Sequence, residues 1–261
     1  ALSQGVRQGL KEGVEKALAD TTVSAILIIC KGRTFIAGAD ISEFGSAPKA
    51  PDFHAVLNTM DHANKPIIAA IHGTALGGGL ETALCCNYRV AVAEAKFGLP
   101  EVNLGLLPGA GGTQRLPRIV GAEKALAMVT TGIPIGAPEA LKLGLIDKIV
   151  SGDLHAEAIA FAREKGVEGL VHPRIRDRDD HLQSARDNPE VFAAVRKMIA
   201  PKTRGFIAPE YNIRCIEAAV NQPFDEGMAT EAKLFKELMA GSQSKAQQYF
   251  FFSERQASKI P

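Results

Sequence analysis

The sequence predicts an α/β protein in which a parallel sheet is followed by a helical C-terminal region. Short apolar runs rich in β-branched residues recur over the first 150 residues, and a glycine-rich turn with a short helix separates two of them. A strand, a crossover helix and a second strand form the βαβ unit of a parallel sheet. From residue 190 onward, apolar residues recur at helical spacing.

The first elements can be placed in order along the chain. Residues 5–18 carry an apolar stripe at helical spacing, which predicts an amphipathic helix. The apolar run 23–30 predicts a buried strand. Residues 67–71 and 88–92 predict two further strands, with a short helix at 80–86 between them. These three elements form the predicted βαβ unit.

Later segments divide the chain into three parts. Residues 138–143 begin with proline and stop before a glycine, which predicts a helix, and a strand is expected at 145–150. We predict an α/β core over 1–170, a polar connector rich in Arg, Asp and Pro over 171–189, and a helical region over 190–261. The helices expected in this last region cover 190–200, 211–221, 229–240 and 243–258.

Composition and charge are those of a globular protein and limit the classes of function. Apolar residues make up 46% of the 261 residues, and the formal net charge is +1, so nothing favours a nucleic-acid surface. No apolar run approaches the roughly 18 residues of a membrane span, and the sequence does not open on a secretory signal. The four cysteines form no CxxC pair, which favours buried free thiols and a reducing compartment.

A glycine-rich turn precedes the helix expected at 80–86. Three consecutive glycines, Gly77 to Gly79, permit positive φ and allow a ligand to approach the main chain closely. A helix that begins there directs free N–H groups at whatever lies before it. Such groups stabilise a carbonyl oxygen that gains negative charge. The same pattern, taken alone, also fits a tight turn in which glycine only relieves packing.

A second loop of small residues, Phe35 to Ile41, follows the first predicted strand. Loops that leave the carboxyl ends of parallel strands converge on one crevice, so this loop is a candidate source of a second N–H donor. Within it, we interpret Asp40 as a helix cap rather than as a catalytic group.

Two glutamates complete this candidate set. Glu81 lies about three residues inside the helix that the glycines open, and Glu101 follows Pro100 in a predicted loop. Paired carboxyls can move protons to and from a substrate. Each glutamate also has a structural interpretation: Glu81 as part of a capping box or a partner of the helix dipole, and Glu101 as a surface carboxylate.

Three other sequence patterns give weaker indications of function. The stretch Gly109 to Gln114 resembles half of a dinucleotide fingerprint, but glutamine replaces the last glycine, so we interpret it as a turn into a helix. The histidines show no HExxH spacing, which argues against a metal site. The aromatic run Tyr249 to Phe252 favours a docking or core face over a base-stacking platform.

Together these motifs resemble the crotonase superfamily, and within it enoyl-CoA hydratase/isomerase, over nearly the whole chain. The resemblance implies a crotonase-like (ClpP/crotonase) spiral of ββα units with a helical C-terminal region. The segments that carry it, in chain order, are Ala37-Gly38-Ala39-Asp40, residues 66–73, the triple glycine followed by Leu80-Glu81, Phe97-Gly98-Leu99-Pro100-Glu101 and residues 104–116.

The resemblance also implies a role for each candidate residue. Ala39 and Gly78 would supply the backbone donors to a thioester oxygen, Glu81 would activate water for attack at C3, and Glu101 would deliver a proton to C2. No metal and no prosthetic group is implied, because coenzyme A enters as part of the acyl-CoA substrate. The residues expected to bind that substrate are Ala37, Gly38, Asp40, Ile41 and Gly77, with Lys31 and Arg33 as candidate phosphate partners.

The C-terminal stretch 246–259 is similar to the connecting helix of multifunctional fatty-acid β-oxidation enzymes, and the arginine-rich stretch 173–178 also resembles that branch. There the hydratase part continues into a 3-hydroxyacyl-CoA dehydrogenase, so we expect this chain to be a fragment of a longer enzyme, with NAD needed only by the absent part. The family's opening strands are also absent, which predicts an exposed sheet edge. The resemblance implies a cytoplasmic location in a bacterium or a peroxisomal one in a eukaryote, and from charge and composition we expect no nucleic-acid partner and no membrane span.

Three functions remain open at this point. Two glutamates favour hydration of a trans-2-enoyl-CoA, with Δ3-Δ2-enoyl-CoA isomerisation as a second activity. An isomerase-dominant enzyme and a catalytically silent CoA-binding or scaffolding module are the alternatives. The resemblance leaves open whether the protein is a monomer or a homo-oligomer.

Overall fold

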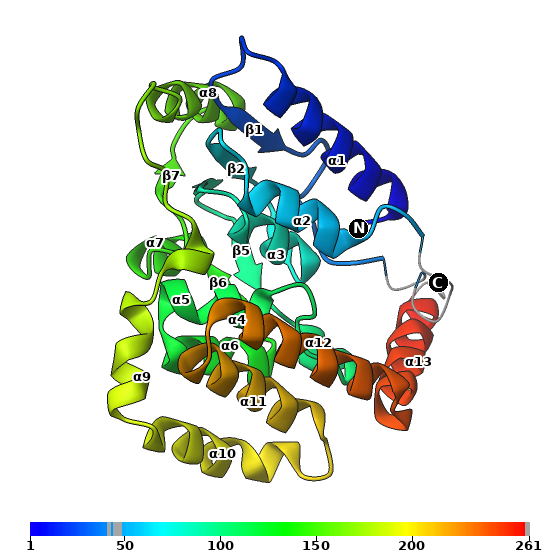
Figure 1. The fold of residues 1–261 in the computed structure, drawn as a ribbon. Helices are drawn as coiled ribbons and strands as arrows, with labels where there is room; N and C mark the ends of the chain where they lie inside the picture. Colours follow the sequence, from blue (N-terminus) through cyan, green and yellow to red (C-terminus); the bar gives the residue numbers. More distant parts are fainter. Residues whose placement is uncertain (41–42, 44–48, 259–261) are drawn as a thin grey trace. The chain divides into compact units, whose positions relative to one another are not determined.

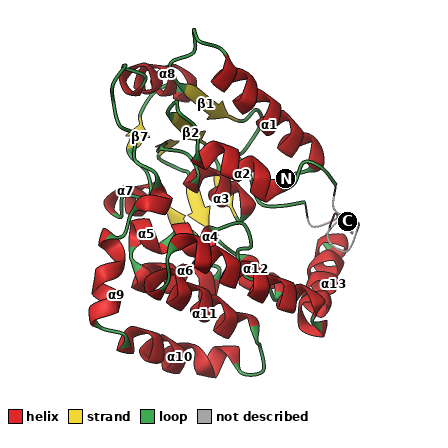
Figure 2. Ribbon diagram, in the orientation of Figure 1, coloured by secondary structure: helices red, strands yellow, loops and turns green. Residues whose placement is uncertain are grey.

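The computed structural model describes residues 1–40, 43 and 49–258 (Figure 1). Contacts divide the chain into two compact units, each built from two separate segments. Unit 1 comprises Ala1–Gly98 and Pro134–Arg178, and unit 2 comprises Leu99–Ile133 and Asp179–Pro261. All strands of the described residues belong to unit 1, whereas unit 2 consists of helices and loops (Figure 2).

A four-stranded parallel sheet forms the centre of unit 1. Its strands, in spatial order, are β1 (Ile26–Ile29), β2 (Ile67–Ile71), β4 (Tyr88–Val92) and β7 (Lys148–Val150). Strand β2 is buried along its whole length because it pairs on both sides and has side chains covered on both faces. The predicted βαβ unit is confirmed: β2 and β4 are parallel neighbours, with Ile68 opposite Tyr88.

The helices of unit 1 flank this sheet. They are α1 (Gln4–Ala19), α2 (Phe53–Asp61), α3 (Gly78–Leu84), α7 (Ala137–Lys142) and α8 (Leu154–Lys165), with a 3₁₀ turn η3 at Ile175–Asp177. Helix α8 packs on the sheet through Ala158 and Ala162, which share a buried cluster with Ile68, Ala70 and Val90. Small residues on the helix let it approach the branched side chains of the strands closely.

A second, small sheet supports the glycine turn. Its strands are β3 (Thr74–Leu76), β5 (Lys96–Gly98) and β6 (Ile135–Gly136), in that spatial order. Strand β3 pairs in parallel with β5, and β5 pairs antiparallel with β6. Two or three residues are too few to show an alternating pattern, so this sheet could not be read from periodicity.

Unit 2 is arranged around helix α11 (Ala208–Asn221), whose buried residues include Ile213, Cys215 and Ile216. It packs against α6, α12, α4 and α10. The other helical elements of unit 2 are η2 (Glu101–Leu104), α4 (Gly112–Arg115), α5 (Pro117–Val120), α6 (Ala122–Thr131), η4 (Asp180–Leu182), α9 (Gln183–Asp187), α10 (Glu190–Thr203), α12 (Phe224–Ala240) and α13 (Ser242–Ala257).

The structure corrects three expectations. Strand β1 covers only part of 23–30, and its last residue, Ile29, is 37% exposed because β1 is an edge strand, so the prediction of a fully buried strand was wrong. Helix α3 begins at Gly78, two residues before the expected start. Residues 171–189 are not a plain connector, since they contain η3, η4 and α9, and Ile175 and Leu182 are buried.

Candidate active site

Two loops of unit 1 each present a backbone amide that follows a glycine with positive φ. Gly38 has φ +122° and precedes Ala39, while Gly77 has φ +52° and precedes Gly78. Residues other than glycine rarely adopt these backbone conformations. The glycines are therefore needed where they stand, because they turn the following peptide N–H groups out of the regular strand direction.

The main chain holds the two loops together. Leu76 N–H donates to the carbonyl of Ile36 over 3.0 Å, and Ile36 forms a parallel bridge with Ala75. As a result, a carbon built at the Cβ position of Gly78 would lie 3.8 Å from the nitrogen of Ala39. The two amides thus lie beside each other, as an oxyanion-binding pair requires.

Within the part of the chain that the structure describes, no acceptor is hydrogen-bonded to the N–H of Ala39 or of Gly78. Ala39 belongs to an exposed stretch of the loop, and Gly78 is buried as the first residue of α3. The first N–H groups of an α-helix have no acceptor within the helix, and Gly78 is in this position in α3.

Glu81 lies one turn into α3 and is only 3% exposed. Its N–H donates to the carbonyl of Gly77 over 3.0 Å and so makes the first hydrogen bond of the helix. The N–H of Gly77 donates to the carbonyl of Gly98, so Glu81 does not complete a capping box. The structure therefore removes that interpretation and leaves Glu81 as a buried acidic residue one turn after Gly78.

Glu101 belongs to unit 2 and begins the 3₁₀ turn η2, after Pro100. The turn is fixed by a hydrogen bond of 3.1 Å from Leu106 N–H to the carbonyl of Glu101. The side chain is half-buried, and its Oε2 atom is fully covered. The interpretation as a solvated surface carboxylate was wrong, because η2 packs against α6 and α13.

The remaining predicted site residues lie in unit 1. Ala37, Gly38 and Asp40 share the loop that carries Ala39, and Gly77 is the N-cap of α3. Ile41 lies outside the described residues. A helix capped by Asp40 would begin at this position, and most of that segment also lies outside the described residues. Lys31 and Arg33 are exposed, so their positively charged side chains can reach the phosphate groups of a ligand.

Sequence reasoning missed a buried carboxylate that binds a helix start in unit 2, Glu231 of α12. Its carboxylate accepts the N–H groups of Gly111 (2.7 Å) and Thr113 (3.2 Å) as well as the Thr113 hydroxyl. These donors open α4, so a carboxylate of the chain itself occupies the helix start where a dinucleotide phosphate would bind. The interpretation of Gly109 to Gln114 as a turn into a helix is confirmed.

A signal for Glu231 exists in the sequence. It falls on the buried stripe of α12, in register with Gly227, Leu234 and Leu238. An acidic residue at an apolar position of an amphipathic helix indicates a buried partner.

Within the described residues, His, Cys, Asp and Glu form no group of three that could hold a metal ion. Over the same residues, every helix is too short or too polar to cross a bilayer.

Comparisons with known proteins found matches both in sequence and in structure. A family model described as enoyl-CoA hydratase/isomerase matches residues 1–195. Proteins from Cavia porcellus and Homo sapiens, both described as peroxisomal bifunctional enzymes, are each 43% identical to this chain, and each match covers 99% of this chain but 36% of the relative. The chain thus spans little more than a third of their length.

Solved structures show the same fold. A structure described as subunit I of an enoyl-CoA hydratase from Geobacillus kaustophilus is 31% identical, with a TM-score of 0.57 over 95% of this chain and 86% of that one. An enoyl-CoA hydratase/isomerase from Pseudoalteromonas atlantica has a TM-score of 0.69 over 97% of this chain and 88% of its own, at 24% identity, which supports the fold alone.

Proposed function

Because the chain belongs to the enoyl-CoA hydratase/isomerase family, we propose that it catalyses the reversible syn addition of water to a trans-2-enoyl-CoA, which gives the 3-hydroxyacyl-CoA in fatty-acid β-oxidation. The observation that carries this proposal is the adjacency of the two unbonded amides, Ala39 N–H and Gly78 N–H, one helical turn from the buried Glu81.

The two amides would hold the thioester oxygen. When water adds to C3, negative charge develops on this oxygen as an enolate forms. Donors that are already oriented stabilise the enolate without reorganisation, and loss of one such donor typically costs about 3–4 kcal/mol of barrier stabilisation. The positive end of α3, which starts at Gly78, acts in the same direction.

The two glutamates would divide the proton transfers. Ionised Glu81 takes a proton from water as the oxygen attacks C3, and protonated Glu101 delivers a proton to C2. This division requires two carboxyls of different environment, one ionised and one protonated. In support, the two environments differ: Glu81 lies in the first turn of α3, whose positive end favours an ionised carboxylate, whereas Glu101 lies in a 3₁₀ turn.

Substrate binding would use the main chain of unit 1. The loop from Ala37 to Ile41, together with Gly77, is proposed to contact the coenzyme A part, with Lys31 and Arg33 near its phosphates. Coenzyme A belongs to the substrate, so the hydratase reaction needs no separate organic cofactor.

We propose that the full-length protein is a bifunctional β-oxidation enzyme. The similarity to peroxisomal bifunctional enzymes over 99% of this chain supports a following 3-hydroxyacyl-CoA dehydrogenase part, which would use NAD, and a peroxisomal location in a eukaryote.

The decisive experiment compares three glutamine variants in a crotonyl-CoA hydration assay that follows loss of enone absorbance. Glu81→Gln and Glu101→Gln should each lower kcat by about 10²–10⁴-fold, because each removes a proton-transfer group. Glu94→Gln, at an exposed position, is the matched control and should retain activity. A protein that binds crotonyl-CoA without hydrating it would instead be a silent binding module.

Isomerisation is the second candidate activity, favoured by the presence of a glutamate at both positions. In this reaction a single carboxyl, Glu101, would move a proton between C4 and C2. Glu81→Gln should therefore abolish hydration and spare much of the Δ3-Δ2 isomerisation. Equal loss of both reactions would contradict the proposed division of roles.

A further inference from the structure

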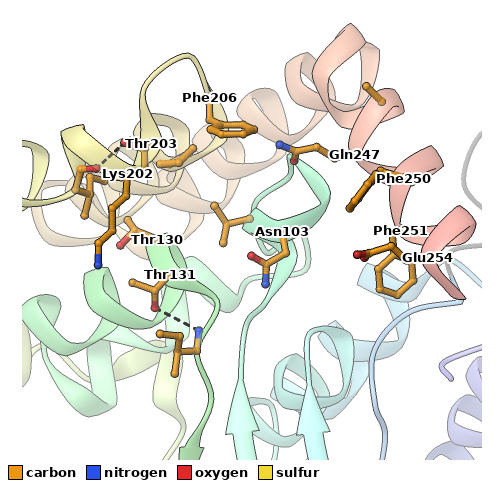
Figure 3. A pocket seen from close by; sticks show the side chains of 15 residues that line it. Asn103, Thr130, Thr131, Lys202, Thr203, Phe206, Gln247, Phe250, Phe251 and Glu254 are labelled. Carbon is orange, nitrogen blue, oxygen red and sulfur yellow. Dashed lines mark hydrogen bonds between the residues drawn. The ribbon is translucent and has the colours of Figure 1, made fainter. Parts of the chain in front are cut away.

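Unit 2 contains a cavity of about 770 Å³, lined mainly by residues of η2, α6, α10, α11 and α13 (Figure 3). The hydroxyls of Thr130, Thr131 and Thr203 in this lining each donate to the carbonyl four residues earlier in the same helix. These threonines are engaged by their own helices and do not identify a ligand. A more specific arrangement lies in unit 1, where Leu2 is bonded to the loop that carries Ala39.

Leu2 contacts this loop through its main chain. Its N–H donates to the carbonyl of Gly38 over 2.8 Å, and Leu2 forms a parallel bridge with Ala39. Leu2 lies two residues before α1 begins at Gln4. The residue pairs therefore with the loop that holds one of the two proposed oxyanion donors.

The bond from Leu2 determines the direction of the Ala39 N–H. The peptide bond between Gly38 and Ala39 is trans and planar, so its C=O and its N–H point in opposite directions. Because Leu2 holds the carbonyl of Gly38, the Ala39 N–H points away from Leu2. Glycine restricts the rotation of this peptide group little, so the hydrogen bond supplies a restraint that steric contacts do not.

The side chain of Leu2 lies beside the second proposed donor. Leu2 is only 2% exposed, and its Cδ2 atom lies 3.3 Å from the position of a Cβ built on Gly78. That same position is 3.8 Å from the nitrogen of Ala39. An apolar group at this point excludes water from one side of the site, which strengthens hydrogen bonds formed there.

Arg7 holds Leu2 from the first turn of α1. Its Nη1 atom donates to the carbonyl of Leu2 over 3.3 Å and to Oε2 of Glu43 over 2.9 Å. Its Nε atom donates to the carbonyl of Pro51 over 3.2 Å, and its side chain is only 11% exposed. A planar guanidinium that donates in several directions is held rigidly. Arg7 thus fixes Leu2 relative to α1.

Resting on the proposed function, we propose that Leu2 is a positioning residue for hydration and that Arg7 anchors it. The N–H of Leu2 holds the Gly38–Ala39 peptide group in the orientation that directs the Ala39 N–H at the thioester oxygen. A misdirected donor weakens most the state in which this oxygen carries negative charge. Loss of the bond should therefore act on kcat more than on ground-state affinity.

The test removes the N–H of Leu2 and keeps its side chain. Leucic acid, the α-hydroxy analogue of leucine, is incorporated at position 2 of the full chain and replaces the N–H by an ester oxygen. We expect kcat for crotonyl-CoA hydration to fall about tenfold, as small misplacements of catalytic groups can cause. The dissociation constant of butyryl-CoA, which is saturated and cannot react, should change less than about twofold.

The matched control is glycolic acid at Gly5, which is exposed in the first turn of α1. A helix does not use the N–H of a residue at that position, so kcat should stay at the wild-type value. Arg7→Gln removes the anchor and should lower kcat without weakening butyryl-CoA binding. Lys16→Gln, which removes a positive charge from an exposed position of the same helix, should not lower kcat.

A bound chromophore reports the donors without turnover. The absorption of trans-cinnamoyl-CoA moves to longer wavelength when hydrogen bonds polarise its conjugated carbonyl. Wild type should produce this red shift on binding, and the leucic acid variant should produce a smaller one at saturating ligand. Lower stability alone would not change the shift, because only folded protein binds the ligand.

Wild-type kcat and red shift in the folded leucic acid variant would overturn the proposal. A loss of kcat matched by an equal loss of butyryl-CoA affinity, with the red shift unchanged, would also overturn it, because Leu2 would then only hold the fold. If wild type hydrates no enoyl-CoA, the proposed function fails. The red shifts of wild type and the leucic acid variant then still decide whether Leu2 directs the Ala39 N–H.

Discussion

At the scale of single residues, adjacent glycines in α3 meet different physical demands. A Cβ on Gly78 would meet Leu2 Cδ2 at 3.3 Å and lie 3.8 Å from Ala39 N, which is close but tolerable. A Cβ on Gly79 would lie 2.0 Å from the carbonyl oxygen of Ile36, which backbone cannot accommodate. A methyl group therefore fits at position 78, whereas the packing of the helix requires glycine at position 79.

This difference gives a prediction for Gly78→Ala. The variant should fold with a melting temperature within a few degrees of wild type, because Gly78 is helical and alanine favours helix. Its kcat/KM should fall about 10²–10³-fold, since the methyl group would intrude where we propose that the thioester oxygen meets the two amides. Thermal denaturation and the crotonyl-CoA assay measure the two effects.

Gly79→Ala is the contrasting variant. It should lose stability severely, with activity lost only as the fold is lost. Unchanged activity in folded Gly78→Ala would contradict the assignment of its N–H to the oxyanion site.

The buried Glu231 gives a second prediction at this scale. Glu231→Gln replaces one carboxylate oxygen by an NH₂ group, which then faces a backbone N–H of Gly111 or Thr113. Two donors that face each other in a buried site should cost about 3 kcal/mol of unfolding free energy, measured by urea denaturation. Glu237→Gln, exposed on the same helix, should change stability by less than about 0.5 kcal/mol.

The candidate residues were identifiable from sequence to unequal degrees. Glu81, Glu101 and the two small-residue loops stood out because several motifs occur in a characteristic order. The adjacency of Ala39 and Gly78 could not be derived from spacing, because it depends on the pairing of Ile36 with β3. Glu231 was missed because its donors lie about 120 residues away in sequence.

At the scale of elements, long periodic segments were predicted well. The strand at 67–71 matches β2, and the helix expected at 5–18 matches α1 within one residue at each end. Where tertiary hydrogen bonds decide the structure, prediction was less successful. The run 145–150 forms a strand only from Lys148, because Leu145 N–H is bonded to the carbonyl of Ala140 at the end of α7.

A cluster at the start of β4 gives a prediction about pH. The Tyr88 hydroxyl lies 3.3 Å from Nδ1 of His172, and the ammonium of Lys165 lies 5.4 Å from the Tyr88 ring centroid. Burial, followed by the positive charge of Lys165, lowers the pKa of His172. Asp147 and Glu164 are the nearby carboxylates that act on Tyr88 and Lys165 in this cluster.

Because the fold disfavours protonated His172, the unfolded chain takes up a proton there more readily as pH falls through about 6.5. The contribution of His172 to stability is therefore fully present above that pH and declines below it, down to the folded pKa. Urea denaturation at pH 7.5 and pH 5.5 should show a smaller acid loss for His172→Gln than for wild type. An NMR titration of His172 with a midpoint at or above 6.5 would contradict the mechanism.

At the scale of the whole molecule, the expected crotonase-like fold is confirmed by the match to solved hydratase structures. The sequence also indicated correctly that strands precede a helical region. The grouping of contacts was not accessible from sequence, because unit 2 takes its first segment, Leu99–Ile133, from the middle of the strand-containing half. Composition does not change at that segment, so no boundary marks it.

The segments of the two units alternate along the chain, so a truncated protein can test whether the first 170 residues fold by themselves. The boundary predicted after residue 170 would separate Leu99–Ile133 from the helices it packs on, since α6 and α4 contact α11 within unit 2. In a fragment of residues 1–170, buried α6 side chains such as Leu126 and Val129 would lose that cover and meet water. Exposed apolar surface of this size favours aggregation over cooperative folding.

We therefore expect fragment 1–170 to be insoluble or to unfold without a sharp transition, and coexpression of 179–261 to recover soluble, cooperatively unfolding protein. Sedimentation and circular dichroism melts measure both outcomes. Since Glu101 is carried by the first segment of unit 2, hydratase activity should return only with the complementing helices. A soluble, cooperatively melting and active fragment 1–170 would show instead that the C-terminal helices are not needed for folding or for activity.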